Sequence, residues 1–278
     1  MSKMRLMTQN LWSCTKNNDV WAALGLDCSA EVRMQANVKI FETLLPDVVG
    51  GQEINKDMQM HLQLALAKAN LPYTLIWGND TPILYRADKF ELLDTEFFLF
   101  PRYMEGLEGE VNNASTKSLC IGVFRAKEDG SVFIFATAHL WWKKESVQPG
   151  SDEARRRQIA LSLTKLEAYA AKYGNCPIIF VGDMNAFYTD PAIQYALSEG
   201  GFAHAHDIAT DFRHEGRGYN ACGPKGPGVW QDRPFETALD HILVKHVKEN
   251  AISRFDRYCP DYYLTISDHA PAFIDIDL

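Results

Sequence analysis

Residues 178–185, with the sequence IIFVGDMN, constrain the fold of this chain more than any other segment. Four consecutive apolar residues predict a strand that is buried on both faces. Gly182 then permits a sharp turn, after which the side chains of Asp183 and Asn185 stand on one side. A carboxylate and an amide at the end of a buried strand can orient a water molecule or a phosphate oxygen. On these eight residues alone, a strand followed by an Asx turn is an equally good interpretation.

Polar residues at the ends or starts of apolar strands recur along the whole chain. Besides Asp183 and Asn185 they are Asn10, Glu53, His139, Asp240, Asp268 and His269. Because strand ends on one rim converge in space, we expect these side chains to form one site. An oxygen-rich set with few histidines and no thiolate suits Mg²⁺ or Mn²⁺ better than zinc. An imidazole backed by a carboxylate can act as a base or stabilise charge.

The pattern of the remaining elements indicates the fold class. Apolar residues at helical spacing predict helices over 29–45, 58–69 and 151–173. Strand-like segments follow one another without intervening helices over 73–98 and over 119–140, which is typical of antiparallel sheets. The absence of strict β–α alternation predicts an α+β fold in which two largely antiparallel sheets pack together with helices outside.

The charge balance limits the partners that the chain can bind. The formal net charge is -8 and the isoelectric point is about 5.5, so a generic polyanion-binding surface is excluded. A phosphate group must then be held by local cations or by a metal. A long nucleic acid would favour a basic track, so we expect a phosphate-containing substrate such as a nucleotide or a single-stranded nucleic acid.

The cysteines and the hydropathy pattern bear on location. The six cysteines are scattered and form no short-spaced pair, which favours reduced thiols over disulfides or a zinc site. No run of eighteen apolar residues and no export signal is apparent. We therefore expect a cytoplasmic protein without stable membrane insertion, of unknown oligomeric state.

Six short motifs in one order resemble the endonuclease/exonuclease/phosphatase superfamily. They are Gln9-Asn10-Leu11-Trp12, Gly51-Gln52-Glu53, Thr137-Ala138-His139-Leu140, Gly182-Asp183-Met184-Asn185-Ala186, Leu239-Asp240-His241-Ile242 and Ser267-Asp268-His269. Each motif alone is weak, but six in order from the first strand to the last are a strong signal. The resemblance implies one domain over residues 1–278 with the four-layer fold of deoxyribonuclease I. It also implies hydrolysis of a phosphoester with a divalent cation, and it is closest to bacterial relatives of the deadenylase and nocturnin branch.

The resemblance assigns the metal and water positions residue by residue. Glu53 is the main ligand of the Mg²⁺ or Mn²⁺ ion, with Asn10 and Asp268 beside it. Asp183 orients or deprotonates the attacking water, and Asn185 holds the phosphate.

The resemblance also assigns the two histidines. His269, paired with Asp240, contacts the scissile phosphate as a base or as a charge stabiliser, and His139 lies on the leaving-group side. Apurinic-site nucleases related to exonuclease III usually lack a histidine at the position of His139, so that subfamily is disfavoured. Lys117 either supplies positive charge to the phosphate or is an ordinary solvated lysine.

Other interpretations stay open at this level. One is a phospholipid or inositol-phosphate phosphoesterase, although neither an apolar membrane hairpin nor a basic cluster is present. Another is a non-catalytic binding module, whose mark would be the loss of Glu53, Asp183 or His269; all three are present. We expect His241 to point away from Asp240 and to serve in packing. The segment 201–237 lacks periodicity and is expected to be an irregular loop whose histidines, including His204, are solvated.

Overall fold

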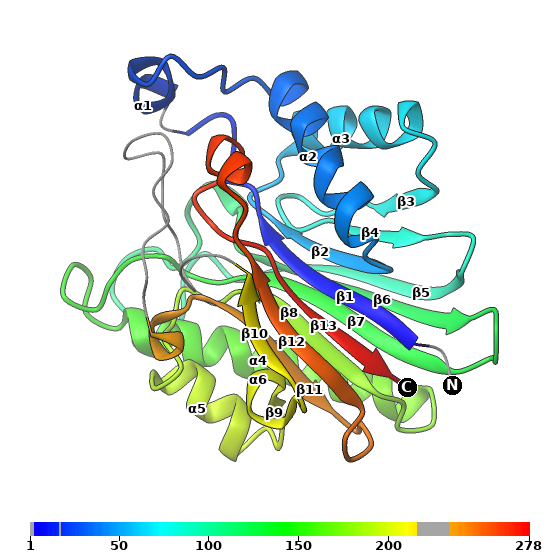
Figure 1. Cartoon of the computed structure of the whole chain (residues 1–278). Coiled ribbons are helices and arrows are strands. Elements are labelled where there is room, and N and C mark those ends of the chain that lie inside the picture. The colour runs from blue at the N-terminus through cyan, green and yellow to red at the C-terminus, as the bar shows by residue number, and fades with distance from the viewer. Residues whose placement is uncertain (1–2, 17, 216–233) are drawn as a thin grey trace.

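Two β-sheets packed face to face form the centre of the molecule (Figure 1). The structure, a computed structural model, describes residues 3–16, 18–215 and 234–278. Within them, the larger sheet has the order β10 (Phe212–Glu215), β12 (Ile252–Tyr258), β13 (Ala272–Asp277), β1 (Lys3–Asn10), β2 (Val48–Gln52), β4 (Ile83–Arg86), β3 (Tyr73–Ile76). The smaller sheet has the order β5 (Phe90–Leu99), β6 (Ser118–Ala126), β7 (Val132–His139), β8 (Ile178–Asp183), β11 (Asp240–Lys245), β9 (Ala203–His204).

Helices cover the outer face of each sheet, giving four layers (Figure 1). The larger sheet packs on α2 (Ala30–Leu44) and α3 (Lys56–Lys68), and the smaller sheet packs on α4 (Ser151–Lys172) and α5 (Pro191–Ser198). The short elements are α1 (Asn18–Ala23), α6 (Ala205–Ile208) and the 3₁₀ turns Asn113–Ser115, Phe235–Thr237 and Asp261–Thr265. Most neighbouring strand pairs are antiparallel, so the predicted fold class is confirmed.

Three apolar clusters hold the layers together. The cluster between the sheets includes Leu6, Phe135 and Val181, and the two outer clusters join each sheet to its helices. None of the helices in the described part of the chain combines the length and the apolarity that a bilayer-spanning segment needs.

Strand direction explains why polar residues far apart in the sequence meet. β1 and β2 are parallel, as are β7 and β8, so each pair ends at the same edge of its sheet. β13, β6 and β11 run antiparallel to these strands, so they begin at that edge. The last residues of β1, β2, β7 and β8 and the first residues of β13, β6 and β11 therefore lie together.

The segment after residue 201 differs from the expected loop. β9, α6 and β10 lie within it, and the side chain of His204 is buried, so the expectation of a solvated histidine is wrong. The physical reason is that β9 pairs with β11 and carries His204 into the interior. The part of the expected loop at 216–233 lies outside the described residues.

Gly182 also differs from expectation, because it lies inside β8 and makes no turn. It has φ +149°, and a Cβ atom there would overlap the carbonyl oxygen of Ala138 on β7. Since β7 and β8 are hydrogen-bonded neighbours, the overlap could be relieved only by separating two buried strands. The missing side chain thus allows the close approach that aligns His139 with Asp183.

We predict that Gly182→Ala lowers the free energy of unfolding by about 3 kcal/mol or more, because the new methyl group meets buried backbone. The matched control is Gly130→Ala, at φ +77° with nothing within 4 Å. It should cost only about 1 kcal/mol through backbone strain. Urea denaturation of both variants measures the difference, and equal small losses would show that the close approach is unimportant.

Candidate active site

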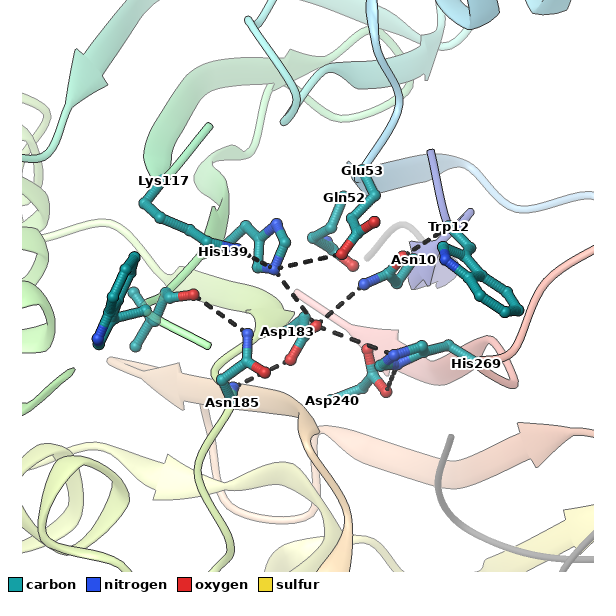
Figure 2. A network of polar contacts seen from close by, with 12 residues as sticks. Asn10, Trp12, Gln52, Glu53, Lys117, His139, Asp183, Asn185, Asp240 and His269 are labelled. Atoms are coloured by element: carbon teal, nitrogen blue, oxygen red, sulfur yellow. Dashed lines mark hydrogen bonds and ion pairs between the residues drawn. The ribbon is translucent and has the colours of Figure 1, made fainter. Parts of the chain in front are cut away.

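The predicted polar residues gather at the edge where the two sheets meet (Figure 2). Asn10, His139 and Asp183 end their strands, Glu53 follows β2 directly, and Lys117 and Asp240 stand at the starts of β6 and β11. Asp268 and His269 lie in the connection that leads into β13. The structure therefore brings the predicted site residues to one region.

Asp183 lies at the centre of this group (Figure 2). Its Oδ2 atom accepts a hydrogen bond from Asn10 Nδ2 at 2.9 Å and lies 3.5 Å from His139 Nε2 and 4.0 Å from His269 Nε2. Its Oδ1 atom accepts from the backbone N–H of Asn185 at 2.9 Å. Burial, reinforced by the charge of Asp240 and opposed by His269, raises the pKa of Asp183 to about 6. The carboxyl is thus suited to exchange a proton near neutral pH.

Glu53 presents a second carboxylate on the other side of the site. Its Oε2 atom accepts from Lys16 Nζ at 2.8 Å and from the backbone N–H of Ser13 at 3.2 Å, and Oε1 lies 3.8 Å from His139 Nε2. Burial opposes ionisation, but His139, Lys16 and Lys117 hold the pKa of Glu53 well below its usual value. Glu53 is therefore an ionised carboxylate at neutral pH.

Asp268 supplies an oxygen that lacks a partner. Its Oδ1 atom is buried and has no hydrogen bond within the described residues. Burial, together with the negative charge of Glu53, raises the pKa of Asp268 to about 6 although His269 opposes the shift. A buried carboxylate oxygen without a partner is costly unless a cation satisfies it.

The donor set fits a hard cation. No group of three or more histidine, cysteine, aspartate or glutamate side chains surrounds a single point in the described parts of the chain. Mg²⁺ and Mn²⁺ do not require such a group, because they bind through one or two carboxylates, waters and substrate phosphate. Glu53 is one ionised carboxylate of this kind, and Asp268, whose pKa burial and that charge raise, is a second oxygen donor near it.

Asn10 is engaged on both functional atoms. Besides the bond from its Nδ2 to Asp183, its Oδ1 accepts from the backbone N–H of Trp12 at 2.9 Å (Figure 2). A role as metal ligand would therefore use the second lone pair of Oδ1. The contact that the structure shows is support of Asp183.

His269 and Asp240 form a buried pair. His269 Nδ1 and Asp240 Oδ2 are 2.8 Å apart, and a guanidinium nitrogen of Arg257 lies 3.9 Å from the same oxygen. Burial opposes the charge on His269, but Asp240, Asp268 and Asp183 raise its pKa well above the ordinary value. Burial likewise opposes ionisation of Asp240, yet His269 and Arg257 lower its pKa. The pair is an imidazolium and a carboxylate at neutral pH.

His139, in contrast to His269, is uncharged. Its Nε2 atom lies 2.6 Å from Lys117 Nζ, and both side chains are at most 2% exposed. Burial and the neighbouring Lys117 lower the pKa of His139 well below its ordinary value, and burial lowers that of Lys117 to about 8. His139 is thus neutral at pH 7 while Lys117 keeps its proton. The alternative of a solvated Lys117 is wrong, because the residue is only 2% exposed and its Nζ contacts His139.

Asn185 lies just beyond β8 with φ +47°. Its Nδ2 donates to the carbonyl oxygen of Leu140 at 3.1 Å, which ties it to the end of β7. A carboxamide nitrogen carries two N–H groups, so one is left to donate to a phosphate oxygen.

Two residues without an assigned role also shape the site. Gln52 Nε2 donates to Thr137 Oγ1 at 2.7 Å, which joins β2 of the larger sheet to β7 of the smaller sheet next to Glu53. Arg33 on α2 donates to the carbonyl oxygens of Leu11, Trp12 and Ile266, next to Asn10 and Asp268. The signal for Arg33 was a cation at helical spacing from Asn37 and Phe41 on the buried face of its helix.

We predict that Asp240→Asn lowers the pKa of His269, because the nearest negative charge is lost while burial still favours the neutral ring. Titration of the His269 Cε1–H resonance by NMR measures the midpoint. It should lie above 6.5 in the native protein and lower in the variant. Asp275→Asn, which removes a carboxylate paired with Arg5 away from the site, is the control. An unchanged midpoint in Asp240→Asn would show that the pair is not charged.

Solved structures of similar fold include two from Bacteroides thetaiotaomicron. One is an endonuclease/exonuclease/phosphatase family protein with TM-score 0.76 and 20% identity, covering 100% of this chain and 96% of that chain. The other is a mannosyl-6-phosphatase with TM-score 0.72 and 19% identity, covering 99% of this chain and 100% of that chain. The catalytic domain of human nocturnin with bound sulfate has TM-score 0.66 and 15% identity, and the match covers 99% of this chain and 94% of that chain. At these identities the likeness shows the fold.

The family follows from the sequence as a whole. No individually curated protein matches the chain. The model of the Endonuclease/Exonuclease/phosphatase family matches residues 7–269, which include every residue of the site described above. The chain therefore belongs to the endonuclease/exonuclease/phosphatase family.

Proposed function

We propose that the chain is a divalent-metal-dependent phosphoester hydrolase that uses Asp183 to activate water. The observation that carries the proposal is the position of the Asp183 carboxylate between two imidazoles, 3.5 Å from His139 and 4.0 Å from His269. The imidazole of His139 is neutral, and that of His269 is charged. Groups whose pKa values are pushed apart in one site are typical of acid and base partners.

Glu53 and Asp268 would hold the metal, with Asn10 contributing through its remaining lone pair. When bound, a Mg²⁺ or Mn²⁺ ion neutralises phosphate charge and polarises the ester. The ionised Glu53 and the unpartnered Asp268 Oδ1 support this placement.

Asp183 takes the proton of the attacking water. With a pKa of about 6 it is mostly ionised at pH 7, and its Oδ1 is fixed by the backbone of Asn185. The remaining N–H of Asn185 and the imidazolium of His269 donate to phosphate oxygens. Because Asp240 keeps His269 protonated, the pair supports the charge-stabilising role of His269 rather than the role of base.

His139 and Lys117 serve the leaving-group side. The Lys117 ammonium is 2.6 Å from His139 Nε2, the ring nitrogen that also faces Glu53 and Asp183, so Lys117 places positive charge beside a departing oxygen. Lys117 with a pKa of about 8 is a better proton donor than an exposed lysine.

The proposed substrates are nucleotides or single-stranded nucleic acid, as in the nocturnin and deadenylase branch. The net charge of -8 supports a small or single-stranded substrate. The similar mannosyl-6-phosphatase makes sugar phosphates a necessary comparison. Cytoplasmic location and a single domain remain part of the proposal.

Hydrolysis of bis(p-nitrophenyl) phosphate tests the proposal. We expect activity that EDTA abolishes and Mg²⁺ or Mn²⁺ restores. Glu53→Gln and His269→Ala should each reduce kcat/KM by about 100-fold or more, since each removes a charge from the reacting centre. Glu91→Gln, on the exposed part of β5, is the matched control and should be unaffected.

Equal activity in the native protein, Glu53→Gln and His269→Ala would reject the site. Absence of activity with every metal would favour the binding-module alternative. A dinucleotide, a single-stranded oligonucleotide, a nucleoside monophosphate, mannose 6-phosphate and sphingomyelin, assayed in parallel, rank the substrate classes.

A further inference from the structure

Asp240 and His241, the first two residues of β11, each contact a different part of the site. Asp240 pairs with His269, whereas the neighbouring His241 points to the other face of the strand, as predicted. There, His241 Nε2 lies 2.8 Å from the carbonyl oxygen of Ala186, the residue that follows Asn185. His241 is completely buried. The expectation that it serves only in packing therefore overlooks a polar contact next to a phosphate-binding residue.

A second buried histidine sets the direction of this contact. His204 Nε2 is 3.0 Å from His241 Nδ1, and the backbone N–H of His206 donates to His204 Nδ1 at 3.2 Å. A backbone N–H only donates and a carbonyl oxygen only accepts. The hydrogens must then run one way, from His206 N–H to His204, from His204 Nε2–H to His241 Nδ1, and from His241 Nε2–H to the Ala186 oxygen. Each ring is neutral and limited to the Nε2–H tautomer.

The strand register keeps this chain of hydrogen bonds in place. His204 on β9 is paired with Leu243 on β11, so its side chain lies on the same face as that of His241, two residues away. Diagonal neighbours of this kind are within reach of long side chains. The ring of Phe235 packs 5.1 Å from that of His204 and stacks on His206 at 3.6 Å, which limits rotation of the imidazoles.

The accepting carbonyl belongs to the turn that presents Asn185. That residue has φ +47°, an uncommon conformation for a residue other than glycine, and such conformations persist only when the surroundings enforce them. The backbone N–H of Asn185 donates to Asp183 Oδ1, and its Nδ2 donates to the carbonyl oxygen of Leu140, the residue after β7. The bond from His241 holds the carbonyl of Ala186, in the peptide one residue beyond Asn185.

We propose that His241 is a positioning residue for Asn185, and that His204 holds His241 in the tautomer that this requires. The proposal rests on the hydrolytic function proposed above, in which Asn185 donates to the phosphate. His241 does not touch the substrate. It acts by keeping the Asn185 carboxamide where its free N–H meets the reacting phosphate, and displacement by about 1 Å can cost a large part of the rate.

Two substitutions of one residue separate positioning from packing. In His241→Gln, the Nε2 amide reaches the same place as the imidazole Nε2 and can still donate to Ala186. In His241→Asn, Oδ1 can accept from His204, but the side chain is too short to reach Ala186. We expect kcat to fall about tenfold or more in His241→Asn and less than threefold in His241→Gln, with both proteins folded by circular dichroism.

A double-mutant cycle with Asn185→Ala shows whether His241 acts through Asn185. If it does, His241→Asn should have almost no further effect on kcat in the Asn185→Ala background, because the group being positioned is gone. The proposal would be overturned if the kcat losses of His241→Asn and Asn185→Ala multiplied in the double variant. It would also be overturned if kcat fell equally in His241→Asn and His241→Gln.

Nitrogen-15 chemical shifts of the histidine rings test the hydrogen-bond chain without any assay. His204 and His241 should both show the Nε2–H tautomer at pH 7. The Nδ1–H tautomer in either ring, or a charged ring, would overturn the arrangement even if hydrolysis is observed. Conversely, absence of hydrolysis in the native protein together with the expected tautomers would refute the proposed function and leave the hydrogen-bond chain standing.

Discussion

The site depends on a buried carboxylate at the junction of two sheets. Asp183 ends a strand of the smaller sheet, and its Oδ2 is bonded to Asn10 at the end of a strand in the larger sheet. A buried carboxylate is costly unless its oxygens are paired, so this contact fixes how the sheet edges meet. Gln52 and Thr137 form a second polar link just below. With both links in place, groups from the two sheets reach one region.

The ionisation of the two histidines follows from their partners. His269 has a carboxylate at 2.8 Å and is charged, whereas His139 has an ammonium at 2.6 Å and is neutral. Both are buried to a similar degree, so burial does not explain the difference. One site thus places a charged imidazole on one side of the Asp183 carboxylate and a neutral imidazole, held beside an ammonium, on the other.

The sequence predicted the strands and the residues at their ends better than it predicted which residues pack against each other. Apolar runs and polar strand ends indicated which residues share an edge, because strand direction and order carry that information. Gly182 was misinterpreted as a turn, since only the packing of Ala138 against it explains the missing side chain. His204 was expected in solvent, because the two-residue strand that buries it is too short to leave a pattern. The burial of Lys117 likewise depends on contacts from distant segments.

The central claim is that Glu53 and Asp268 mark the position of a divalent cation beside Asp183. Crystals grown with Mn²⁺ and measured at the manganese absorption edge test it most directly. An anomalous peak in contact with the carboxylates of Glu53 and Asp268 is the expected result. Strong anomalous density bound only to other residues, with none at this pair, would contradict it.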